Sequence, residues 1–332
     1  MDIRNLSNIK TTSAHRVGSA PQEKKIVLIY SLLVMGLALL TTVVRYVLGL
    51  QIDQLGGLSN MSTRTVLSTL QSVLPLFQSL VIMCLDLGYI AAMLRVARGQ
   101  YASPNTLRLG FDRFWTLLRC AVFQGLFYSG LLIASVYLAS MAFVVSPWGQ
   151  DFTDAAAPLL SQTSLLNPQM ALDDATAMAL LPTMVPMFLM IAIAVCLLVV
   201  PVVYRLRMVN YVIIDKPGMG ALAALRESRK MMRGNCLKLL KLDLSYWWFY
   251  LILAVIAAIG NLDLWLPLFG VTLPLNGDFA YFLFYGIYLA LQIVAYCFLR
   301  NRIEVSYALV YDAIKPEEPK DGGVVLGNIF QM

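Results

Sequence analysis

Residues 224–250 read ALRESRKMMRGNCLKLLKLDLSYWWFY and join two chemically different halves. The first half is basic, and the second leads through tyrosine and tryptophan into a long apolar run. Tryptophan and tyrosine beside lysine and arginine are typical of a helix that enters a bilayer, because the rings prefer the head-group layer. The stretch therefore predicts a cytoplasmic interfacial helix over 220–233, followed by a membrane span over about 239–261.

The composition of the whole chain fits a membrane protein. Of its 332 residues, 59% are hydrophobic and 13% are charged, and the mean hydropathy is +0.72. A soluble domain carries about 25% charged residues. The net charge of +6 would suggest a nucleic-acid partner in a soluble protein. Here it indicates basic cytoplasmic loops, and we expect no nucleic-acid binding.

Six apolar segments are long enough to cross a bilayer, which takes about 20 residues. They cover about 26–50, 66–94, 114–145, 182–204, 239–261 and 279–300. We therefore predict an all-α polytopic membrane bundle with six transmembrane helices and short cytoplasmic interfacial helices. The remaining parts are a cytoplasmic N-terminal tail (1–25), an external loop (146–181) and a disordered C-terminal tail (315–332), with the membrane domain covering 26–314.

The distribution of charge predicts the orientation of these spans. Most of the 25 lysines and arginines fall in the N-terminal tail, in 95–119, in 205–241 and from Arg300 onward, whereas the intervening loops hold mainly aspartate. The positive-inside rule then places both termini in the cytoplasm of a bacterial plasma membrane. Arg95, Arg207 and Arg302 each begin a basic, aromatic segment, which suggests three tandem helical hairpins. The alternative is that any protein with this topology repeats basic cytoplasmic loops.

Asp86 is the one acidic residue well inside a predicted span. An unpaired charge there would cost several kcal/mol, so we expect a partner or a wet cavity. Arg119 enters the third span to a similar depth, and Asp86 with Arg119 forms the candidate intramembrane ion pair. A structural role for this pair is favoured over an ion or substrate site.

The sequence lacks the motifs of catalysis and cofactor binding. It contains no GxxxxGK[ST], HExxH or GxSxG motif, its only histidine is His15 in the polar tail, and its five cysteines include no CxxC pair. We therefore expect no enzyme, no catalytic residue, no cofactor and no metal site.

The opening stretch, preceded by VYRLRMVNYVIIDKP, also resembles an uncharacterised bacterial integral-membrane family that is common in Firmicutes, domain-of-unknown-function family nine-seven-five. The matching positions are Ala224, Ser228, Met232, Gly234, Lys238, Leu239, Leu242, Leu244, Ser245 and Trp248. The resemblance is strong over about 200–250 and weaker over the other spans. It implies a multi-span helical membrane protein and supplies no reaction or ligand.

The function that we expect is that of a non-enzymatic membrane protein whose basic cytoplasmic helices engage anionic lipid or a protein partner. On helix 220–233, Leu222, Leu225 and Met232 would face the lipid. The candidate contacts are Arg226, Arg229, Lys230, Arg233, Lys238, Lys241, Trp247 and Trp248. The alternative is a small-solute or lipid transporter, or an export accessory subunit, with Asp86 in a polar path.

Overall fold

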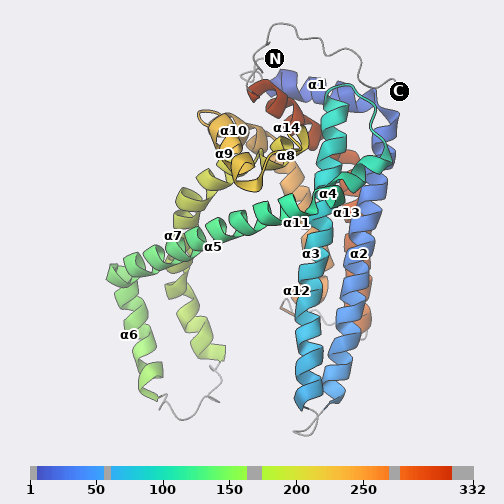
Figure 1. The fold of residues 1–332 in the computed structure, drawn as a ribbon. Coiled ribbons are helices and arrows are strands. Elements are labelled where there is room, and N and C mark those ends of the chain that lie inside the picture. The colour runs from blue at the N-terminus through green and yellow to red at the C-terminus, as the bar shows by residue number, and fades with distance from the viewer. Residues whose placement is uncertain (1–5, 56–60, 163–173, 269–276, 316–332) are drawn as a thin grey trace, which may run out of the picture. The chain divides into compact units, whose positions relative to one another are not determined.

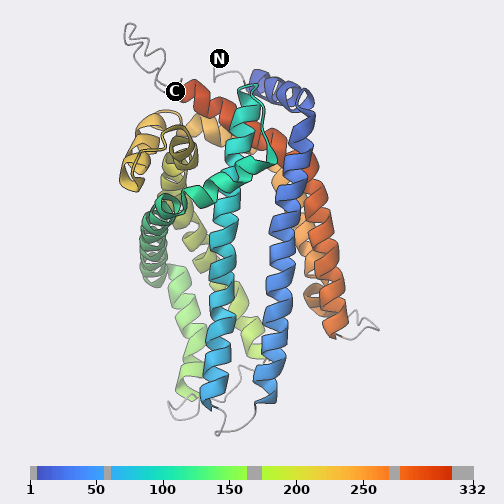
Figure 2. The same cartoon turned by 45° about the vertical axis from the view of Figure 1, so that its right-hand side comes forward.

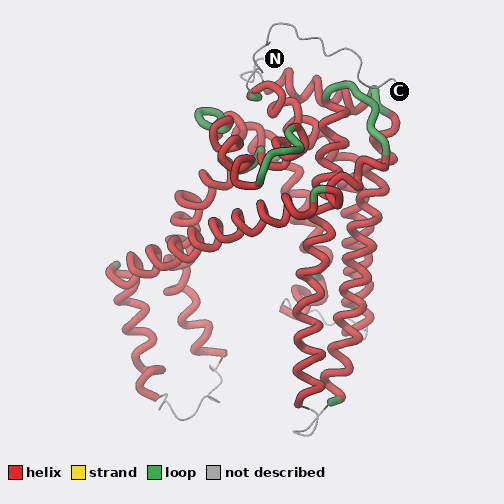
Figure 3. The backbone as a smooth tube through the Cα atoms, viewed as in Figure 1, coloured by secondary structure: helices red, strands yellow, loops and turns green. Residues whose placement is uncertain are grey.

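The structure is a computed structural model that describes residues 6–55, 61–162, 174–268 and 277–315. Every element over these ranges is a helix (Figure 3), as the sequence predicts. Five helices are long and apolar enough to cross a membrane: Gln22–Gln54, Met61–Ala97, Phe114–Val145, Pro182–Asp215 and Gly277–Ile314. A sixth span is formed if Cys236–Ser245 and Trp247–Gly260 count together, although they are bent by 57°. The chain is thus a multi-pass membrane protein.

The chain divides into two compact units. Unit 1 contains Met1–Leu117 and Met208–Met332, and unit 2 contains Leu118–Arg207. The boundary between them falls inside α5 (Phe114–Val145) on one side and just after α7 (Asp174–Leu206) on the other.

The membrane-spanning part of unit 1 contains two packed helix pairs. Helix α2 (Pro21–Gln54) packs along α3 (Met61–Ala97), and α11 (Trp247–Gly260) packs along α13 (Gly277–Ala295). Helix α2 also contacts α13, and Figure 2 shows the two side by side. These pairs correspond to the first and third predicted hairpins. Pro21 lies in the first turn of α2, where a backbone N–H would have no acceptor within the helix, so the N–H that proline lacks is not missed.

Short helices gather at one end of unit 1 (Figure 1) and form a core of their own. Helix α14 (Asn301–Ile314) packs against both α1 (Leu6–Gly18) and α3, and α8 (Val209–Asp215) also packs on α3. The segment predicted as an N-terminal tail therefore contains a packed helix. Ile9, Ser13 and Val17 are its buried positions, at steps of four along one face. We call this end of unit 1 the basic end.

Two glycines allow α3 to meet the backbone that follows it. A Cβ atom on Gly88 would lie 2.6 Å from the carbonyl carbon of Leu107, in η2 (Pro104–Arg108). One on Gly110, in α4 (Leu109–Asp112), would lie 2.6 Å from the carbonyl carbon of Cys84. Side chains larger than hydrogen cannot fit at either position unless the backbone shifts.

The fifth predicted span is not one straight helix. Helix α10 (Cys236–Ser245) ends at Tyr246, and α11 leaves at an angle of 57°. Tyr246 is buried, and its hydroxyl forms a hydrogen bond of 2.9 Å with Ser306 of α14. Lys10 of α1 donates to the carbonyl of Ser245 at 3.0 Å and lies over the Tyr246 ring. The bend is thus fixed by contacts from α1 and α14.

In unit 2, α6 (Pro147–Gln162) packs against α7. Helix α6 occupies much of the predicted external loop 146–181, and residues 163–173 of that loop lie outside the described residues. The packed pair of this unit is therefore α6–α7, which differs from the expected hairpin of the third and fourth spans. The predicted disordered tail also lies outside the described residues, except for Lys315.

Candidate functional site

Asp86 lies on α3 where three helices of unit 1 meet. Its Oδ1 accepts hydrogen bonds from the Tyr30 hydroxyl of α2 and from Arg300 Nη2 at 3.2 Å. Arg300 Nη1 donates to the same Tyr30 hydroxyl at 2.9 Å. The three side chains form a closed triangle, so the acid is paired and the spans are tied together.

Aromatic rings enclose the guanidinium of Arg300. Its central carbon lies 5.0 Å from the ring centroid of Tyr30, 5.1 Å from that of Tyr89 and 4.6 Å from that of Tyr296. Tyr30 and Tyr89 stack at 4.5 Å. Arg300 closes η3 (Tyr296–Arg300), a single π-helical turn between α13 and α14. Such turns are rare, and they occur frequently at functional sites.

The structure gives Asp86 a different partner from the one expected. Arg300 was assigned to the cytoplasmic end of the sixth span, where it only supported the orientation. Arg119 belongs to unit 2, and its pairing with Asp86 stays a prediction. A sequence gives the depth of a charge along its own helix but not which helix is its neighbour.

A polar face of α13 and η3 was missed by the sequence reasoning. It consists of Tyr281, Tyr285, Tyr288, Gln292, Tyr296 and Arg300, and we call it the tyrosine face. Steps of three and four place these side chains on one side of the helix. That spacing inside an apolar run is visible in the sequence.

The tyrosine face is linked by hydrogen bonds. Thr42 of α2 donates to the Tyr285 hydroxyl at 3.0 Å. Gln292 donates to the Tyr296 hydroxyl at 3.1 Å and also hydrogen-bonds Tyr288. Tyr296 then contacts Arg300, which reaches Asp86. The polar contacts therefore run from the middle of α13 to the acid on α3.

A cavity of about 270 Å³ lies beside Asp86. It is lined by Ser79, Ile82, Met83 and Asp86 of α3, together with Leu117 and Asn210. The wall is partly apolar, and Asp86 is its only charged lining residue. Such a cavity could hold water or one small polar group beside the carboxylate.

An ion network joins three segments at the basic end. Arg98, just after α3, forms ion pairs with Asp215 of α8 at 2.8 Å and with Asp312 of α14 at 2.6 Å, and Lys315 pairs with Asp215 at 2.8 Å. Hydrogen bonds to the Asp312 and Asp215 carboxylates raise the pKa of the Arg98 guanidinium. The segments that follow the second, fourth and sixth predicted spans thus converge on one network.

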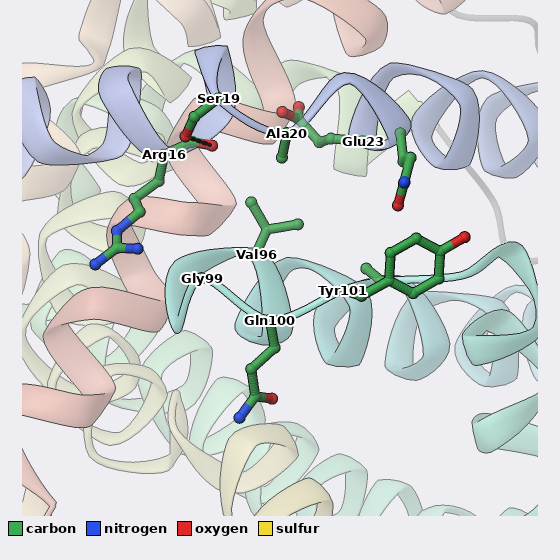
Figure 4. Close-up of a pocket in the computed structure, with 10 residues that line it drawn as sticks. Arg16, Ser19, Ala20, Glu23, Val96, Gly99, Gln100 and Tyr101 are labelled. Carbon is green, nitrogen blue, oxygen red and sulfur yellow. Dashed lines mark hydrogen bonds between the residues drawn. The ribbon is translucent and has the colours of Figure 1, made fainter.

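A polar hollow of about 340 Å³ lies between the α1–α2 junction and the end of α3 (Figure 4). Arg16 passes over Gly99, where a Cβ would lie 2.5 Å from its Nη1 and where φ is +71°. The Ser19 hydroxyl is within reach of the carbonyls of His15 and Arg16. The lining residues of this hollow include no nucleophile paired with a base.

The predicted lipid-contact residues lie on α9 (Ala221–Met231), in the turn that follows it, on α10 and on the first turn of α11, which together we call the basic elbow. The exposed members of the predicted set are Arg226, Arg229, Lys230, Arg233, Lys241, Trp247 and Trp248. Lys238 is half-buried and donates to Asn235 Oδ1 at 2.9 Å. Gly234, with φ of +83°, ends this part of the elbow as a left-handed residue.

One residue of the elbow was assigned to the wrong side. Met232, expected to face the lipid, is 0% exposed. It follows the last turn of α9, next to Met231, and both side chains point into the protein. Leu222, at 51% exposure, does face outward. The apolar residue at the start of α9 therefore faces outward, whereas the one that follows its last turn packs inside the protein.

Comparison with known sequences places the chain in a family. The sequence model of the family described as "Protein of unknown function (DUF975)" matches residues 6–318. The match covers nearly the whole chain, which therefore belongs to this family. No curated protein and no solved structure matches the chain.

Proposed function

We propose that this chain is a multi-pass protein of the bacterial plasma membrane, with both termini in the cytoplasm, and that its basic elbow binds anionic lipid head groups. In this proposal the protein is a binding protein rather than an enzyme, and it needs no cofactor. The observation that carries the proposal is the separation of buried and basic residues on α9.

Helix α9 is amphipathic in a way that suits a charged surface. Ala221, Ala224, Ser228 and Met231 form its buried face. Arg226, Arg229 and Lys230 are exposed, and Arg233 follows them in the turn. The single acid of α9, Glu227, lies 3.5 Å from Lys216. The four outward bases are thus left to attract anions.

Helix α10 adds apolar side chains beside these charges. Leu237 and Leu244 are 71% and 61% exposed, and Lys241 lies between them on the same face of α10. Trp247, 62% exposed, follows at the start of α11. Apolar side chains that enter the head-group layer beside bases are typical of interfacial helices. An acidic protein segment could use the charges, but it would leave these leucines without a role, so lipid is favoured.

The test compares two adjacent pairs of exposed bases. Arg229→Gln/Lys230→Gln removes two charges from the elbow, and Lys24→Gln/Lys25→Gln removes two at the start of α2. Native mass spectrometry of the full chain would measure retained phosphatidylglycerol relative to phosphatidylcholine. Because each base near an anionic surface contributes about 1 kcal/mol, removal of the elbow pair should lower the preference for phosphatidylglycerol about thirtyfold. An equal loss in both variants would show that overall charge, and not the elbow, retains the lipid.

A further inference from the structure

The tyrosine face extends across a full membrane thickness. Asp278, which is hydrogen-bonded to Tyr46 of α2, lies before its first tyrosine, and Arg300 closes it. At 1.5 Å per residue, this stretch is about 33 Å long, close to the hydrocarbon thickness of about 30 Å. Polar side chains are therefore present at every level between two charged ends.

The tyrosine face is also partly open within unit 1. Tyr285, Tyr288, Gln292 and Tyr296 are half-buried, and Tyr281 is exposed. Helix α2 borders the face through Thr42 and Tyr30. Helix α11 borders it at Gly260, where a Cβ would lie 2.8 Å from that of Tyr288. The rings line the seam between these two helices without being enclosed by them.

A half-open row of hydroxyls is costly against lipid tails but suits a polar group that moves along it. Tyrosine offers two kinds of contact: its hydroxyl can donate to a phosphate oxygen, and its ring face attracts a quaternary ammonium. A zwitterionic phospholipid head group carries a phosphate and an ammonium group, which is quaternary in phosphatidylcholine, and the ring face attracts a primary ammonium as well. Arg300 and Asp86 at the end of the row supply the same two charges.

We propose that the tyrosine face is a track along which zwitterionic phospholipid head groups cross the membrane, while their tails stay in the bilayer. The protein would then equilibrate lipid between the two leaflets. A proton path fits the same residues less well, because Arg300 carries a permanent positive charge between Tyr296 and Asp86. This proposal does not rest on lipid binding by the elbow.

The test uses the full chain reconstituted into phosphatidylcholine liposomes that contain a trace of phosphatidylcholine with a dithionite-sensitive fluorophore on one tail, so that its head group stays zwitterionic. Dithionite added outside bleaches only the outer leaflet unless lipid crosses. We expect the protein to expose the inner label to bleaching. Protection of the inner label equal to that in protein-free liposomes would overturn the proposal. Because these liposomes contain no anionic lipid, the outcome is separate from the phosphatidylglycerol measurement.

Matched variants locate the path. Tyr288→Phe/Tyr296→Phe removes the two hydroxyls that contact Gln292 and keeps both rings, so packing volume is preserved. Lipid crossing should slow about tenfold, because two hydrogen-bonding groups are lost from the track. The control is Tyr128→Phe/Tyr137→Phe, on α5. In this variant lipid should cross the membrane at the wild-type rate. Equal slowing in both pairs, or no slowing in the first, would overturn the assignment of the path.

Discussion

The two halves of α3 differ in what covers them. From Met61 to Met83 no residue of this fully described stretch is buried by the protein, whereas from Cys84 to Ala97 nearly every one is. The first half can be covered by lipid tails, which make few demands on side-chain shape. The second half is covered by α8, α14, η2 and α4, which demand a close fit. The difference teaches that the specific packing of unit 1 is concentrated at the basic end.

The largest effect that would test this contrast is expected at Gly110. Gly110→Ala places a methyl group against the backbone of Cys84, which cannot move as a flexible side chain would. We expect the free energy of unfolding in detergent to fall by about 3 kcal/mol. The control is Gly36→Ala in α2, where nothing lies within 4 Å of the new atom. A similar loss at Gly36 would mean that glycine itself, and not close packing, matters.

The same leucine-to-alanine change in each half of α3 compares the halves directly. Leu87 is 0% exposed and Leu76 is 65% exposed. Detergent tails are as apolar as leucine, so the cost of Leu87→Ala comes mainly from the cavity that it leaves, about 2 to 3 kcal/mol. Leu76→Ala should change the unfolding free energy by less than about 0.5 kcal/mol. Chemical unfolding of both variants measures the two changes in the free energy of unfolding. Equal changes would show that the two halves of α3 are packed equally closely.

The ion network should contribute less than the apolar contacts around it. Arg98→Met removes the shared partner of Asp215 and Asp312, while Lys315 still pairs with Asp215. We expect a loss of about 2 kcal/mol, because an acceptor of low exposure is left with fewer donors. Arg108→Met, at an exposed base of η2, is the control and should stay within about 0.5 kcal/mol. Equal thermal stability of the Arg98→Met and Arg108→Met variants would show that the ion network does not stabilise the basic end.

The smallest effect concerns the pairing between spans. A double-mutant cycle of Asp86→Asn with Arg300→Met should give a coupling of about 1 kcal/mol, since the two side chains are in contact. A cycle with Arg119→Met tests the partner predicted from the sequence. Coupling confined to Arg119 would contradict the observed pairing with Arg300.

Much of the fold could be predicted because membrane spans depend mainly on the length of apolar runs. The helices α2, α3, α5, α7 and α13 fall where the sequence placed five spans. The bend at Tyr246 could not be predicted, because it depends on Ser306 and Lys10, which are remote in the sequence. Helix α1 was missed because its buried face has only two apolar residues, Ile9 and Val17, with the polar Ser13 between them.

The candidate site was predictable only in part. Asp86 stood out because an acid inside a span needs a partner, but the identity of that partner depends on which helices are neighbours. The bases of the elbow followed from local spacing, and their contact with lipid or a protein partner stays a prediction. The tyrosine face has steps of three and four that are visible in the sequence, but tyrosines are common in membrane spans and carry no charge that would demand a partner.

The bend that ends α10 leaves α11 with only 14 residues. At 1.5 Å per residue this helix is about 21 Å long, well short of the hydrocarbon thickness of about 30 Å. A bilayer adapts to so short a helix by thinning around it or by drawing in the segments at its ends. Because α11 packs against α13, any thinning would occur next to the tyrosines, where it would shorten the distance between the two leaflets.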